Sequence, residues 1–262
     1  MRYLLTSLLC FLTLSLTAQD DCQGPDFNND GVIGAADIIV FLTYYGNEWP
    51  LAPAFVCGET IAHQDYPYST VEIGDQCWFA ENCRYLPEVS PSDEDSDTAP
   101  KYYVYGYSGI DIEEATTTLN YETYGVLYNW LAIITENICP SGWHLPLDSE
   151  WQTMEISLGM SESEASSTSF RGAPVGDYMK STSGWNSDGN GSNASGFNGL
   201  PGGFRGDWSK DFEGLGIYGY WWSSSEDNVQ ASWYRLLYKQ SDDVYRGSYW
   251  NEGGFSARCV RD

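Results

Sequence analysis

Six cysteines remain in this chain once its first eighteen residues are set aside, and they restrict how it folds. An even number of cysteines in an exported protein favours disulfide bonds over metal binding or catalysis. Six cysteines allow fifteen pairings, so the sequence does not choose among them. The cysteines are Cys22, Cys57, Cys77, Cys83, Cys139 and Cys259.

Residues 1–18, MRYLLTSLLCFLTLSLTA, have the pattern of a secretory signal peptide. Arg2 precedes an apolar run from Leu4 to Leu16, and Ala18 is the small residue at the cleavage site. This run is too short for a good membrane span, and no second run is long enough. We therefore expect a secreted protein, extracellular or at the cell surface, with no membrane span.

The chain is strongly acidic, with a formal net charge of −25. A surface of this charge repels phosphate backbones and anionic membranes. Nucleic acid is therefore not an expected partner.

Residues 26–37, DFNNDGVIGAAD, have the spacing of a calcium-binding loop. Oxygen-bearing side chains stand at positions 1, 3, 5 and 12, and Gly31 stands at position 6, where the chain turns sharply. The loop ends in Asp instead of the Glu of an EF-hand, which resembles the dockerin version, and a helix-like run follows it. The expected Ca²⁺ ligands are Asp26, Asn28, Asp30, Val32 through its carbonyl, and Asp37.

This dockerin-like module, residues 22–46, contains a single loop of this kind. Dockerins that bind a cohesin use two such loops packed as a pair, so cohesin is not an expected partner. A repeat of this size is too small to form a hydrophobic core of its own, so we expect it to pack against the large domain. Residues 47–57 are expected to form a linker, and residues 58–262 the large domain.

The large domain combines a few helical patterns with many short strand-like runs. Trp130 and Ile134 share one helical face, and a second helix that contains Trp151 is expected to stop at Gly159. Residues 161–164, SESE, match a capping box and predict a third short helix. The late runs GYWWSSS, ASWYRLLYK, DVYRGSYW and GFSARCVRD are short, aromatic and separated by turn residues, which is typical of strands. This order predicts an α+β fold.

Five segments appear in a characteristic order: TVEIGDQCWFAEN, YGVLYNWLA, CPSGWHLPLDSEW, GFNGLPGGFRG and GYWWSSSE…GFSARCVRD. Together they resemble the Fibrobacter succinogenes major paralogous domain, a family of exported bacterial domains, over about residues 58–262. The resemblance implies a C-type-lectin-like domain, with few short helices, a small twisted antiparallel sheet and long disulfide-stapled loops. Where that family has Thr or Ser as a helix cap this chain has Leu147, so we expect Asp148 to cap the helix instead.

The resemblance also implies a disulfide between Cys139, near a helix, and Cys259 on the last strand. A bridge that closes a loop of this length stabilises a protein by about 4–5 kcal/mol in the chain-entropy model. The remaining pairings stay open. The arrangements considered are Cys57–Cys77 with Cys22–Cys83, or a Cys77–Cys83 bridge.

No catalytic constellation is recognisable in the sequence. The chain lacks a Gly-x-Ser-x-Gly elbow and a phosphate-binding loop that opens a helix with Lys. His144 lies in the GWHLP motif, where we expect a packed and hydrogen-bonded side chain. We therefore expect a protein that is not an enzyme.

Aromatic residues are abundant, with 11 Trp and 20 Tyr, and rings with a polar edge suit recognition surfaces. Strand alternation turns about half of such side chains inward. The rings expected in the core are Trp222, Trp233 and Phe255. The rings expected at the surface, as ligand-binding residues, are Trp221, Tyr234, Tyr245 and Trp250. Residues expected in a loop that could hold a sugar-binding calcium are Glu226, Asp227 and Asn228.

These observations predict a secreted, non-catalytic binding or adhesion protein that recognises an extracellular carbohydrate or protein, with Ca²⁺ in the N-terminal loop. One alternative is an accessory component of an extracellular polysaccharide-degrading system that is recruited through the dockerin-like loop. A second alternative, implied by the resemblance, is an enzyme with a fold related to that of the formylglycine-generating enzymes.

Overall fold

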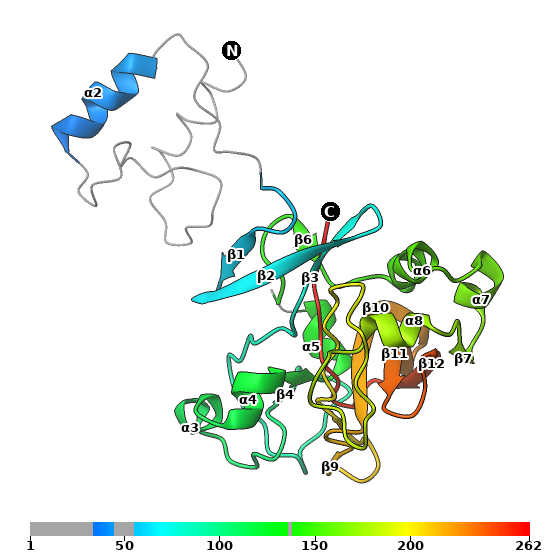
Figure 1. Cartoon of the computed structure of the whole chain (residues 1–262). Helices are drawn as coiled ribbons and strands as arrows, with labels where there is room; N and C mark the ends of the chain where they lie inside the picture. The colour runs from blue at the N-terminus through cyan, green and yellow to red at the C-terminus, as the bar shows by residue number, and fades with distance from the viewer. Residues whose placement is uncertain (1–33, 45–54, 136–137) are drawn as a thin grey trace. The chain divides into compact units, whose positions relative to one another are not determined.

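The computed structural model describes residues 34–44, 55–135 and 138–262 (Figure 1). The chain divides into two compact units, Met1–Phe55 and Val56–Asp262. In the first unit the described element is helix α2, Ala35–Tyr44, which coincides with the helix-like run after the predicted calcium loop. The predicted ligands Asp26, Asn28, Asp30 and Val32 and the cysteine Cys22 lie outside the described residues. Asp37 lies in α2, and its side chain is also outside them.

The second unit mixes two main antiparallel sheets with short helices, as expected for an α+β fold (Figure 1). One sheet has the strand order β1-β2-β3-β13-β6. Its strands are β1 (Thr60–His63), β2 (Tyr66–Ile73), β3 (Gln76–Phe79), β13 (Val260–Arg261) and β6 (Trp143–His144). Strands β1 and β2 are joined by Gln64 and Asp65, which both have positive φ, as a tight hairpin turn requires.

The other main sheet has the order β10-β11-β12-β7. Its strands are β10 (Tyr218–Asn228), β11 (Ala231–Tyr238), β12 (Val244–Trp250) and β7 (Ser169–Arg171). The first three correspond to three of the strand-like runs in the sequence. Two small ladders complete the strands: β4 (Tyr102–Tyr103) with β5 (Leu127–Tyr128), and β8 (Phe204–Arg205) with β9 (Phe212–Glu213).

Six short helices are described in the second unit. They are α3 (Ile112–Thr116), α4 (Leu119–Tyr124), α5 (Trp130–Thr135), α6 (Asp148–Ser157), α7 (Glu162–Ser166) and α8 (Val175–Met179). Ser161 caps α7 in a capping box with Glu164, as the sequence predicts. The helix predicted around Trp130 starts later than its periodicity suggests, because residues 127–128 pair with β4 as strand β5. No helix in the described ranges is long and apolar enough to span a bilayer.

Helix α6 begins one residue earlier than the sequence suggests, and Asp148 does not cap it. The N-cap is Leu147, whose backbone N–H donates to the Glu150 carboxylate at 2.7 Å. The Asp148 N–H donates to Ser225 Oγ on β10 at 2.9 Å, and its carboxylate turns towards the sheet. A contact from a distant strand therefore replaces the local cap.

Two disulfides cross-link the second unit. Cys139 pairs with Cys259, the pairing that the resemblance implies, and Cys57 pairs with Cys77. Cys83 is a free, buried thiol, so neither the Cys77–Cys83 nor the Cys22–Cys83 bridge is formed. The reason is packing, because Cys83 is enclosed in the core with its Sγ 3.6 Å from that of Cys259.

Candidate functional site

The β10-β11-β12-β7 sheet has two faces of opposite character. On the inner face, Trp221, Leu237 and Val244 are buried in one apolar cluster with Trp151 and Met154 of α6. Side chains alternate along each strand, so the neighbours of these residues point to the other side of the sheet. The inner face fixes the sheet on the body of the unit and leaves the outer face as the candidate site.

Five charged side chains also lie on the inner face, between α6 and the sheet. Glu155 is fully buried and accepts hydrogen bonds from Arg171 Nη2 and Arg235 Nε, both at 2.6 Å. Asp148 accepts from Arg235 Nη1 and Arg246 Nη2, both at 2.7 Å. Burial alone would raise the pKa of Asp148, but the two guanidinium groups outweigh it and lower this pKa to about 2. We call these five residues the buried ion cluster.

The outer face of the same sheet carries a layer of tyrosines with one phenylalanine. Rows of these rings run across the four strands, because residues at alternate positions point outward. The rings are Tyr218 and Tyr220 of β10, Tyr234 and Tyr238 of β11, Tyr245 and Tyr249 of β12, and Phe170 of β7. We call this set the tyrosine face.

Neighbouring rings of the tyrosine face pack against one another across the strands. Tyr218 stacks on Tyr238 with ring centroids 5.1 Å apart, and Tyr220 stacks on Tyr234 at 5.5 Å. Such aromatic pairs contribute about 0.5–1.5 kcal/mol each beyond the area that they bury. Phe255 covers the centre of the face at 5.2 Å from Tyr234. Most of the remaining rings stay half-buried, so their edges reach the surface.

Trp208 is 94% exposed, and its sequence neighbour contacts the tyrosine face. It belongs to the turn between β8 and β9, and the preceding residue, Asp207, hydrogen bonds with the phenol of Tyr249. Burial and the Asp207 carboxylate raise the pKa of Tyr249, so this phenol keeps its proton. An indole open to solvent therefore stands one residue from a contact with the tyrosine face.

The sequence did not single out Trp208, although a local signal was present. This tryptophan stands in GDWSKD, between a glycine and polar residues, and such a turn places its middle residues at the surface. Trp208 lies outside the strand-like runs from which the ligand-binding rings were predicted.

The structure distributes the four predicted ligand-binding rings over both faces. Tyr245 is half-buried on the tyrosine face, and Trp250 is 49% exposed at the end of β12, on the opposite face. Trp221 and Tyr234, expected at the surface, are 0% and 7% exposed and lie in the interior. The expectation fails because both faces of the sheet are covered there, the inner one by α6 and the outer one by Phe255.

Of the three rings predicted to lie in the core, two are fully buried and one is half-buried. Trp222 and Phe255 are fully buried and stack with centroids 4.3 Å apart. Trp233 is half-buried, because it stacks under the Arg246 guanidinium at the border of the buried ion cluster.

Glu226, Asp227 and Asn228 are exposed at the end of β10. Asn228 Nδ2 donates to Asp227 Oδ2 at 3.1 Å, and Asn228 Oδ1 accepts from the Gln230 N–H. Within the described ranges there is no group of three or more His, Cys, Asp or Glu side chains that could hold a metal ion.

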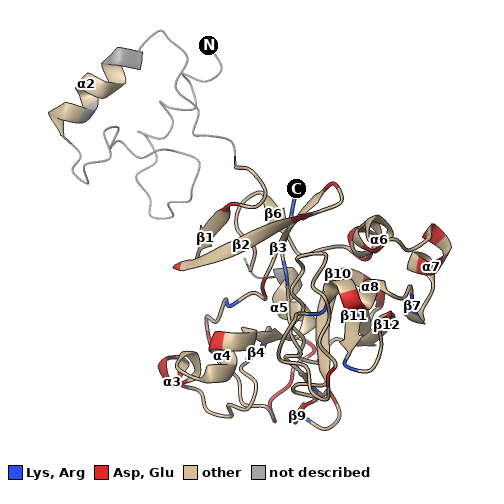
Figure 2. Cartoon of the chain, in the orientation of Figure 1, with Lys and Arg blue, Asp and Glu red and all other residues tan. Residues whose placement is uncertain are grey.

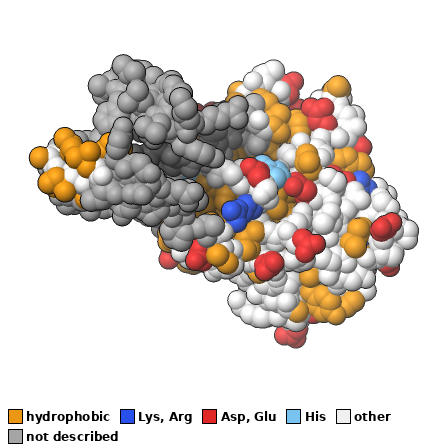
Figure 3. Space-filling model, turned by 90° about the horizontal axis from the view of Figure 1, so that it is seen from above, with side chains coloured by type: hydrophobic (Ala, Val, Ile, Leu, Met, Phe, Trp, Pro, Cys, Tyr) orange, Lys and Arg blue, Asp and Glu red, His pale blue; other side chains and the backbone are white. Residues whose placement is uncertain are grey.

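Acidic side chains dominate the surface because Asp and Glu outnumber Lys and Arg by 37 to 12, and because several of the basic side chains are buried. Figure 2 shows Asp and Glu on α3, α4 and α7, and Figure 3 shows acidic side chains spread over one face with few basic ones. Six lysines and arginines of the described region have buried side chains. They are Arg171, Lys180, Arg205, Arg235, Arg246 and Arg258. Anionic ligands therefore find little attraction on this unit.

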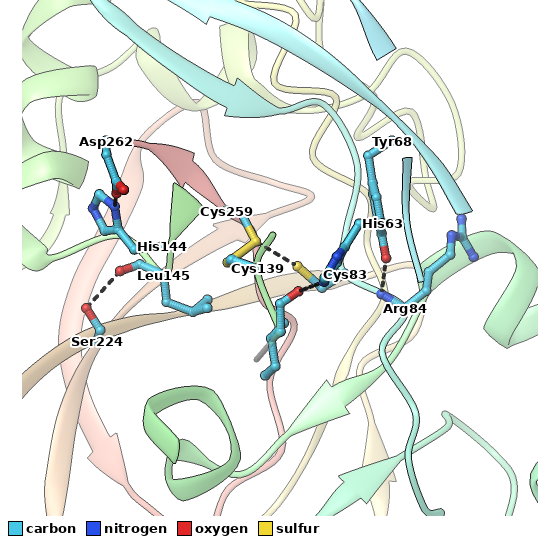
Figure 4. Close-up of a disulfide and its surroundings, with 11 residues drawn as sticks. His63, Tyr68, Cys83, Arg84, Cys139, His144, Leu145, Ser224, Cys259 and Asp262 are labelled. Atoms are coloured by element: carbon cyan, nitrogen blue, oxygen red, sulfur yellow. Dashed lines mark hydrogen bonds and ion pairs between the residues drawn. A yellow bond between two sulfur atoms is a disulfide. The ribbon is translucent and has the colours of Figure 1, made fainter. Parts of the chain in front are cut away.

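His144 is the one histidine of the GWHLP motif, and it joins the start of α6 to the end of the chain. Its Nε2 lies 2.8 Å from Glu150 Oε1, and its Nδ1 lies 2.5 Å from Asp262 Oδ1 (Figure 4). Partial burial lowers the pKa of His144, but the two carboxylates outweigh it and raise this pKa overall. The side chain acts here as a connector between two acidic groups.

Two shallow surface hollows lie away from the tyrosine face. One, of about 240 Å³, is lined by residues around the Cys57–Cys77 disulfide, including Glu72 and Arg261. The other, of about 310 Å³, lies between Pro87 and Tyr102. Neither contains a residue of the tyrosine face.

The family model described as Fibrobacter succinogenes major domain matches residues 71–261. No curated protein and no solved structure matches the chain.

Proposed function

The chain belongs to the Fibrobacter succinogenes major domain family, and from this premise we propose that it is a secreted, non-catalytic binding protein. In this proposal the second unit is a C-type-lectin-like module, and the tyrosine face with Trp208 binds a neutral extracellular polysaccharide. The Cys139–Cys259 disulfide supports the lectin-like assignment, because it links the segment before α6 to the residue directly before the last strand, β13. Two disulfides also suit an oxidising, extracellular location.

The observation that carries this proposal is the position of Trp208. An indole that is 94% exposed leaves a large apolar surface in water, and such a surface becomes favourable when a ligand covers it. The neighbouring phenols provide hydroxyl groups that donate and accept hydrogen bonds. Together they offer apolar contact for the ring faces of a sugar and polar contact for its hydroxyls.

The charge of the protein selects a neutral ligand. With a net charge of −25 and many of its basic side chains buried, the chain repels uronic-acid and sulfated polysaccharides. Most rings of the tyrosine face are half-buried and lie side by side across the strands. This arrangement suits an extended polymer better than a small molecule that requires an enclosed pocket.

The proposal includes Ca²⁺ in the N-terminal loop as a structural ion. Its support is the ligand spacing from Asp26 to Asp37 and helix α2, which begins at Ala35, close to the end of the loop. Removing one ligand with Asp30→Ala is expected to abolish the calcium-dependent rise in melting temperature. An unchanged calcium effect in this variant would reduce the loop to a simple turn.

Binding is tested by applying the full-length protein to immobilised neutral polysaccharides, such as β-glucans, xylans and mannans, with pectin and alginate as anionic counterparts. We expect retention on at least one neutral polymer and none on the anionic polymers. Trp208→Ala is expected to weaken binding about tenfold, which corresponds to about 1.4 kcal/mol.

Trp250→Ala is the matched control, because Trp250 is an exposed tryptophan on the opposite face of the same sheet. This variant is expected to bind like the unaltered protein. An equal loss in both variants, or no retention on any neutral polymer, would refute the proposed surface.

A further inference from the structure

Cys83 is a buried free thiol that packs directly against a disulfide. Its Sγ lies 3.6 Å from Sγ of Cys259, which is bonded to Cys139, so that three sulfur atoms meet (Figure 4). The Cys83 N–H donates to the carbonyl of Ala257 at 2.9 Å, so the two segments that carry Cys83 and Cys259 lie side by side. A bond between Cys83 and Cys259 therefore requires only a small movement of side chains.

A buried cation without a carboxylate partner lies beside this thiol. Arg258 is fully buried and donates to the side chain of Asn82 at 3.1 Å and to three backbone carbonyls, all of which are neutral acceptors. Burial lowers the pKa of Arg258 to about 9, and the charges of an ionised Cys83 and of Glu81 counteract this effect in part. This guanidinium favours the thiolate form of Cys83.

The charged groups around Cys83 oppose the effect of burial in part. Burial raises the pKa of the Cys83 thiol to about 12, while Arg258 and Arg84 lower it and Glu81 raises it. The thiolate, which is the reactive form, is therefore a minor species at neutral pH and increases with pH.

The three cysteines differ in their access to solvent. Cys83 and Cys259 are buried, whereas Cys139 is partly exposed. Freeing Cys139 from its disulfide would thus place a thiol where reagents and partners reach it.

We propose that Cys83 exchanges with the Cys139–Cys259 disulfide and thereby makes Cys139 a covalent modification site for small disulfides. The Cys83 thiolate attacks Sγ of Cys259, the Cys83–Cys259 bond forms and the Cys139–Cys259 bond breaks. Cys139 leaves as a thiolate and takes up the proton that Cys83 lost, so this step consumes no oxidant or reductant. A low-molecular-weight disulfide then captures the Cys139 thiolate as a mixed disulfide and releases one thiol.

The exchange is tested on the native full-length protein with iodoacetamide, which alkylates thiolates, followed by peptide mapping without reduction. We expect the label on Cys139, together with a peptide linked through Cys83 and Cys259. The labelling rate is expected to rise about tenfold per pH unit between pH 7 and 9, in proportion to the thiolate fraction. Label on Cys83 with the original disulfide intact, or no label on either cysteine, would overturn the proposal.

The chain contains its own control and a discriminating variant. The Cys57–Cys77 disulfide has no such thiol beside it in the described ranges, so neither of its cysteines is expected to be labelled. Cys83→Ser is expected to abolish labelling at Cys139, with near-ultraviolet circular dichroism as the check on folding. Continued labelling of Cys139 in this variant would show that the disulfide opens without Cys83.

A second variant tests the alternative bond directly. In Cys139→Ser, Cys83 and Cys259 are expected to form a disulfide, which peptide mapping detects. Two alkylated thiols at these positions in the folded variant would contradict the inferred exchange.

Discussion

Replacing Glu155 by glutamine tests how strongly the buried ion cluster holds α6 to the sheet. Glu155 is fully buried, and its two oxygens accept hydrogen bonds from Arg171 and Arg235. Glutamine keeps the size and shape of the side chain but removes its charge. It also places an N–H₂ donor against a guanidinium, which has no acceptor to offer.

The magnitude follows from the charges that remain. The cluster contains three arginines and two carboxylates, so the substitution leaves Asp148 as the single anion among three buried cations. Breaking a buried ion pair by removing one partner costs about 3–5 kcal/mol, because the other charge stays buried without compensation. In a unit of this size each kcal/mol lowers the melting temperature by about 2–4 °C, so we expect a decrease of about 6–20 °C.

Urea unfolding at pH 7, followed by tryptophan fluorescence, measures this loss of stability. Glu88→Gln is the matched control, because Glu88 is exposed and its substitution is expected to change the free energy of unfolding by less than about 0.5 kcal/mol. A loss below about 1 kcal/mol for Glu155→Gln would refute the reasoning. It would show that the arginines find solvent or other acceptors once the carboxylate is neutral.

Two further predictions concern pH. The folded-state pKa of Asp148 is lowered to about 2, so the ionised carboxylate stabilises the fold fully above about pH 4, and this stabilisation is lost as the pH falls towards 2. The expected loss in the free energy of unfolding is about 2 kcal/mol. Urea unfolding at a series of acidic pH values measures it, and the loss is expected to be absent in Asp148→Asn. The folded-state pKa of His144 is raised, so its stabilisation is complete below the unfolded-state pKa near 6.5 and is lost as the pH rises through the folded-state value. His144→Gln is expected to flatten the unfolding free energy between pH 6 and 9, and an unchanged slope would contradict the link through Glu150 and Asp262.

Local signals in the sequence determine most of the secondary structure. Gly159, with a φ of +119°, follows α6, and the Ser161 capping box starts α7, so this pair of helices was predictable from a short stretch of chain. The late strands were predictable for the same reason, because turn residues separate aromatic runs.

Contacts between distant residues decided what the sequence left open. Arg235 points inward because it donates hydrogen bonds to Asp148 and Glu155 of α6, and Glu155 is eighty residues earlier in the chain. No local sequence pattern reveals such partners. Contacts between distant residues also determine which rings of the candidate site are exposed. Tyr245, expected at the surface, is half-buried, whereas Tyr234 on the same face is buried because Phe255 covers it.

Different contacts stabilise the two faces of the β10-β11-β12-β7 sheet. The buried ion cluster on the inner face uses directed hydrogen bonds to hold α6, so the position of the sheet does not rely on covering its outer face. On that outer face, rings that stack across strands, such as Tyr218 on Tyr238, stabilise the surface around the centre that Phe255 covers. Rings already fixed by their neighbours lose little conformational freedom when a ligand binds, which reduces the entropy cost of binding. A polysaccharide site of this kind is therefore expected to be formed before its ligand arrives.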